Sequence, residues 1–103
     1  MVKDVFKEVA IVEMKHAEII AERISYLGGK PTTELAPIID VGETLKEMLE
    51  NDVKVEESTI EFYRRIIDRA MKEGDITTAE IFRGLLKDKE EHHDTFSSIL
   101  EEV

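Results

Sequence analysis

Apolar residues recur every three or four positions along three stretches of the chain, the spacing of one face of an α-helix. The stretches run from about residue 2 to 27, from about 43 to 72, and from about 76 to 102. Most of the charged residues lie at the other positions of each stretch. The pattern therefore predicts an all-α fold of three long amphipathic helices.

Glycine and proline mark where these helices end. In "LGGKP", Gly28 or Gly29 is expected to take the left-handed C-terminal cap, and the proline prevents the helix from continuing. In "KEGD", Gly74 predicts a tight turn, and Asp75 or Thr77 is suited to cap the third helix.

The segment 28–42 is expected to be a long crossover between the first two helices. It contains both prolines and three of the five glycines of the chain. About fourteen extended residues span roughly 45 Å, whereas a helix of about 26 residues is roughly 39 Å long. The crossover can therefore run back along the first helix, as in helical bundles with one long connection.

Composition narrows the class of protein. With 103 residues the chain is expected to form a single domain, 1–103. Lys and Arg number 14 against 24 Asp and Glu, and the net charge of -10 argues against nucleic acid or an anionic membrane as partner and favours cations. The absence of cysteine excludes thiolate metal sites. Neither a signal-peptide block nor an 18-residue apolar run occurs, so a soluble cytoplasmic protein is expected.

Each predicted helix turns polar in its middle. All three histidines lie there, together with several acids and a lysine: Glu13, His16, Glu56, Lys89, Glu90, His92 and His93. Charges buried at one level of a bundle need a common partner, and a divalent cation is the simplest one.

The spacing of these residues suits a metal site. Glu13 and His16 form a Glu-x-x-His pair on one helix face, although such pairs are also common as simple salt bridges. Oxygen and nitrogen ligands favour iron or manganese, and zinc remains a candidate. On the third helix, either Lys89 and His92 or Glu90 and His93 face inward, and the apolar stripe slightly favours the first pair.

Three segments resemble the bacterioferritin family. "EMKHAEIIAERISYLGGKP" is similar to the second helix and following turn of that family, and "GETLKEMLENDVKVE" and "LLKDKEEHHDTFSSIL" are similar to its third and fourth helices. The resemblance covers essentially the whole chain and implies a ferritin-like helical bundle. It also implies a di-iron ferroxidase centre made of one Glu from each of two helices and a Glu-x-x-His from each of the other two. Carried over, Glu13, His16 and Glu56 are ligands and catalytic residues.

Two departures from the family pattern concern this centre. The family begins with a further long helix that supplies a ligand glutamate and that this sequence does not contain. That ligand would come from a second copy of the chain or from a segment that precedes this sequence. We expect a partner chain to complete the groove in a homo-oligomer, at least a dimer. In the ungapped alignment Lys89 and His92 occupy the last Glu-x-x-His, whereas Glu90 and His93 restore the motif one residue later. His92, Glu90 and His93 are therefore all candidate ligands.

Met14 lies where bacterioferritins carry an axial haem ligand, so the resemblance makes it a candidate haem-binding residue. Methionine also commonly fills packed helix contacts, and that interpretation stands beside the first. Tyr26 and the phenylalanines are expected in the core.

The function implied by the resemblance is binding of Fe(II) and its oxidation by dioxygen or peroxide, for iron storage or detoxification. One alternative is an inert or metal-buffering bundle with a degenerate centre. Another is a different di-metal carboxylate activity, such as peroxide removal.

Overall fold

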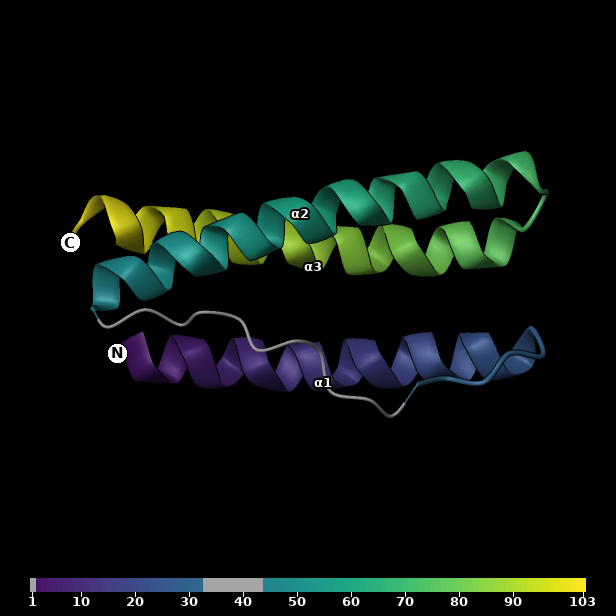
Figure 1. Cartoon of the computed structure of the whole chain (residues 1–103), viewed down its shortest axis with the longest axis horizontal. Helices are drawn as coiled ribbons and strands as arrows, with labels where there is room; N and C mark the ends of the chain where they lie inside the picture. The colour runs from purple at the N-terminus through teal and green to yellow at the C-terminus, as the bar shows by residue number, and fades with distance from the viewer. Residues whose placement is uncertain (1, 33–43) are drawn as a thin grey trace. The chain divides into compact units, whose positions relative to one another are not determined.

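The computed structural model describes residues 2–32 and 44–103, and these residues form three helices (Figure 1). They are α1 (Val2–Tyr26), α2 (Leu45–Lys72) and α3 (Ile76–Glu101). The predicted all-α fold is confirmed, and every helix end lies within two residues of its expected position. Most of the predicted crossover falls on 33–43, outside the described residues.

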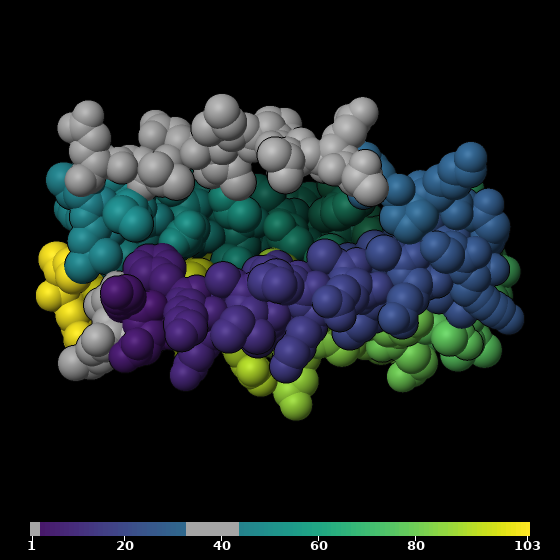
Figure 2. Space-filling model, turned by 90° about the horizontal axis from the view of Figure 1, so that it is seen from below, coloured from purple at the N-terminus to yellow at the C-terminus, as the bar shows by residue number. Residues whose placement is uncertain are grey.

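The chain divides into two compact units, of which the first contains α1 and the second contains α2 and α3. Figure 2 shows α1 in purple to blue as a continuous ridge of side chains. None of the helices in the described part of the chain is both long and apolar enough to span a membrane.

α1 ends at a glycine cap, as predicted. Gly28 has φ +90°, a conformation that side chains with a Cβ adopt only with strain. The Gly29 N–H donates to the Ile24 carbonyl at 2.9 Å, and the Gly28 N–H donates to the Ser25 carbonyl at 3.1 Å. These two bonds form a Schellman motif, which satisfies carbonyls that the helix would otherwise leave unpaired at its end.

The same motif turns the chain between α2 and α3. Gly74 has φ +75°, and the Asp75 N–H donates to the Ala70 carbonyl at 2.8 Å. Asp75 then caps α3, because its carboxylate accepts from the Thr78 N–H at 3.1 Å and from the Thr78 hydroxyl at 2.5 Å. Of the two caps that the sequence left open, the structure uses Asp75. The short turn makes α2 and α3 an antiparallel hairpin (Figure 1).

The core of the hairpin consists of apolar residues on one face of α2 and one face of α3. The rings of Tyr63 and Phe82 pack edge to face, with their centroids 5.2 Å apart and an angle of 82° between the ring planes. The buried apolar side chains come from both helices: Leu49, Ile60, Tyr63 and Ala70 on α2, and Ala79, Phe82, Leu85 and Phe96 on α3.

Two aromatic residues expected in the core are instead exposed. Tyr26 is 70% exposed at the last residue of α1, and Phe62 is 52% exposed on α2. Neighbouring residues on a helix point about 100° apart, so burying Tyr63 turns Phe62 outward. Arginine side chains partly cover both rings, with the Arg23 guanidinium 4.8 Å from Tyr26 and the Arg65 guanidinium 5.7 Å from Phe62.

We expect Asp75→Ala to lower the free energy of unfolding by about 1 kcal/mol, because it removes the acceptor of the Thr78 N–H at the start of α3. Asp75→Asn is the matched control and should keep most of the stability, since asparagine caps helices about as well as aspartate. Urea denaturation monitored by circular dichroism measures both. Equal losses in the two variants would show that the carboxylate charge matters more than the cap.

Candidate metal centre

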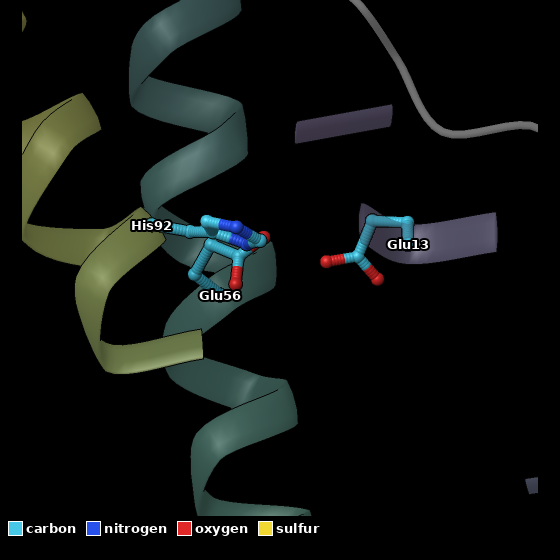
Figure 3. Close-up of side chains that lie close together, drawn as sticks. All are labelled: Glu13, Glu56 and His92. Atoms are coloured by element: carbon cyan, nitrogen blue, oxygen red, sulfur yellow. The ribbon is translucent and has the colours of Figure 1, made fainter. Parts of the chain in front are cut away.

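Glu56 of α2 and His92 of α3 lie together at the polar middle of the hairpin (Figure 3). A carboxylate oxygen of Glu56 and an imidazole nitrogen of His92 lie within 4.8 Å of each other. Glu56 is buried and His92 is half-buried. Metal–ligand bonds to oxygen and nitrogen are about 2.0–2.2 Å long, so one ion could bind both side chains after a small rotation.

Lys89 shares this position, one turn before His92 on α3. Its ammonium Nζ is 3.7 Å from Oε2 of Glu56, and the two side chains are only 6% and 7% exposed. The first of the two registers considered from the sequence is therefore the one that faces inward. The Lys89 amine thus lies beside Glu56, the most buried carboxylate of the hairpin.

Glu90 and His93 point to a different place. Glu90 pairs with Arg64, with 3.5 Å between Nη2 and Oε2, and His93 lies 3.7 Å from a carboxylate oxygen of Glu57. These four side chains line an open pocket of about 580 Å³. The structure thus does not bring Glu90 and His93 to Glu56 and His92.

The sequence did not reveal the roles of Glu57 and Arg64. Glu57 directly follows Glu56 on α2, and Arg64 lies about two turns further along the same helix. Both side chains contact α3 on the exposed side of the hairpin. Their partners depend on how the two helices align along each other, which no pattern within one helix indicates.

The remaining candidates belong to α1. Glu13 and His16 lie one turn apart on that helix, so their side chains share a face; Figure 3 labels Glu13. Met14 is 65% exposed, which leaves its thioether available to a group outside the chain.

Asp52 lies one turn before Glu56 on the same stripe of α2. Burial raises the pKa of the Asp52 carboxyl above its usual value, because the ionised form loses hydration. The polar middle of the hairpin therefore holds a carboxylate that is costly to ionise beside the ion pair of Glu56 and Lys89.

Comparison with known proteins identifies the family. The Ferritin-like domain matches residues 2–103, so the chain belongs to the ferritin-like family. The bacterioferritin of Desulfovibrio desulfuricans is 37% identical over 93 residues, which are 90% of this chain and 52% of that protein. That of Streptomyces coelicolor is 36% identical over 89 residues, which are 86% of this chain and 53% of that protein.

A solved structure agrees with this assignment. The X-ray structure of Desulfovibrio desulfuricans bacterioferritin, described with its diiron site in different catalytic states, matches with a TM-score of 0.87 at 36% identity. The match covers 92% of this chain and 56% of that one. The resemblance to bacterioferritin and the ferritin-like helical fold are thus confirmed, and the chain spans about half the length of the relatives that it matches.

Asp52→Asn should stabilise the protein at neutral pH. Because the pKa of Asp52 is raised in the folded state, ionising this group opposes folding. That penalty is fully present above the folded-state pKa and disappears below the unfolded-state value near 3.8, so the gain in the variant should shrink as the pH falls toward 4.

Urea midpoints at pH 7 and pH 4 measure this difference. Asp68→Asn removes an exposed charge from the same helix and controls for the loss of one negative charge. A difference between wild type and Asp52→Asn that is equal at both pH values would contradict the prediction.

Proposed function

We propose that this chain binds Fe(II) and oxidises it for iron storage or detoxification. The centre would combine carboxylates and imidazoles of three helices: Glu13, His16, Glu56 and His92. The observation that carries the proposal is the convergence of Glu56 and His92 in a chain of the ferritin-like family. The diiron site described for the Desulfovibrio desulfuricans relative supports iron as the metal.

The donor types fit this chemistry. Carboxylate oxygens are hard ligands that favour Fe(III) over Fe(II), and therefore lower the cost of giving up an electron. Imidazole nitrogens bind Fe(II) well, and they also accept manganese or zinc. Bound Fe(II) would supply the electrons for the reduction of dioxygen; reduction to hydrogen peroxide takes two electrons and two protons, and hence two Fe(II). Glu56 and His92 would hold the metal on the hairpin, and Glu13 and His16 would be the ligands contributed by α1.

A second candidate function is metal buffering without rapid oxidation. The contact between Lys89 and Glu56 favours it, because the ammonium competes with a metal ion for the carboxylate. Both functions require that the protein binds Fe(II). They differ in the rate at which bound Fe(II) becomes Fe(III).

Fe(II) added anaerobically and then exposed to air should be oxidised faster by the protein than in buffer alone, as followed by ferric absorption. His92→Ala and Glu13→Ala should each slow this reaction on the order of tenfold or more, since even partners of metal ligands commonly matter by that factor. Glu61→Gln removes an exposed carboxylate and is the control. A wild-type rate no faster than that in buffer would favour metal buffering.

We also propose that the chain forms a homo-oligomer, at least a dimer. Large apolar side chains are exposed along α1, where Ile11, Met14 and Ile19 are 45%, 65% and 40% exposed. Contact with a second copy would remove this surface from water. Exposure of Met14 is also compatible with its predicted role as a haem ligand between copies, which an absorption spectrum of the purified protein checks.

Size-exclusion chromatography with light scattering should therefore give at least twice the chain mass of 11.8 kDa. Ile11→Glu places a charge on the exposed apolar surface and should shift the protein toward smaller species, whereas Lys15→Glu, also on α1, should not. A monodisperse wild-type monomer would contradict the proposal.

A further inference from the structure

The ion pair between Lys89 and Glu56 is the unusual feature of the candidate centre. Both side chains are buried, and both belong to the stripes that carry His92 and the hairpin core. Removing an ammonium from water is costly unless an opposite charge lies close by, and Glu56 provides that charge at 3.7 Å. Glu56 is thus shared between a role as metal ligand and a role as partner of Lys89.

Lys89 cannot itself be a ligand while it is charged, because an ammonium has three donors and no lone pair. Its effect on the centre is through charge. The two-ion centres of this bundle class use four carboxylates, whose charge balances two divalent ions. Replacing one carboxylate by an ammonium changes the charge by two units, which is the charge of one divalent ion.

We propose that Lys89 is a built-in cation that takes the place of one of the two metal ions, so that the centre of this chain binds a single divalent ion. The inference rests on the proposed metal-binding function and makes it more specific. Glu56 and His92 hold the remaining ion, while the Lys89 ammonium supplies the second positive charge beside Glu56.

A single ion changes the oxidation chemistry. One Fe(II) would supply only one electron to dioxygen on becoming Fe(III). A two-electron reduction of dioxygen to peroxide needs a second Fe(II) in the same centre. The wild-type chain should therefore oxidise Fe(II) more slowly than a variant in which a second ion binds.

Isothermal titration with Zn(II), which has no redox chemistry, tests the inference without reference to activity. Wild type should bind one Zn(II) per chain at the centre, and Lys89→Glu should bind two. Lys87→Glu makes the same change of charge at an exposed position of α3 and should still bind one. Far-UV circular dichroism establishes that each variant is helical.

Lys89→Gln provides a second measurement that does not depend on creating a new ligand. It removes the competing charge, so Zn(II) should bind on the order of tenfold or more tightly than to wild type, with the stoichiometry still one. Lys87→Gln should leave the affinity within about twofold of wild type, because its ammonium is exposed and screened.

The outcomes separate the two proposals. Two Zn(II) bound by wild type, or equal affinity in wild type and Lys89→Gln, would overturn the role of Lys89 while leaving metal binding intact. Failure of Zn(II) and of Fe(II) to bind wild type and all variants would overturn both. One ion in wild type, two in Lys89→Glu and tighter binding in Lys89→Gln would support the inference.

Discussion

The structure depends on the neutralisation of charge buried at the middle of the α2–α3 hairpin. Glu56 and Lys89 are almost completely buried there, and each would be strongly destabilising without the other. The apolar contacts on both sides, such as Tyr63 against Phe82, supply the attraction that holds the two helices together. The buried ion pair of the hairpin thus lies in its middle turns, with apolar contacts on both sides.

The sequence predicted those features that are fixed within a single helix. The caps at Gly28 and Gly74 follow from local backbone geometry, and the buried stripes follow from a repeat of 3.6 residues. It favoured only slightly one side of α3 over the other as the side that faces Glu56. The two candidate pairs, Lys89 with His92 and Glu90 with His93, differ by one residue, and a shift of about 100° decides between them.

The tertiary contacts of the hairpin settle that choice. With Leu85 and Phe96 buried against α2, the positions between them at the same phase are those of Lys89 and His92. Glu90 and His93 then meet Arg64 and Glu57 on the exposed side. Similarly, Phe62 was expected in the core because of its residue type, but Tyr63 has the phase that points inward.

Lys89 also affects the empty state of the proposed centre. Carboxylates gathered to hold metal ions repel one another when no ion is present, and the free energy of folding then depends on metal binding. A cation that belongs to the chain keeps Glu56 neutralised whether or not an ion is bound. Under the role proposed for Lys89, the hairpin loses little stability on releasing its ion, so the centre can fill and empty repeatedly. That property suits a site through which iron passes. If the folded state of the hairpin were stable only with the metal bound, release of the metal would be unfavourable.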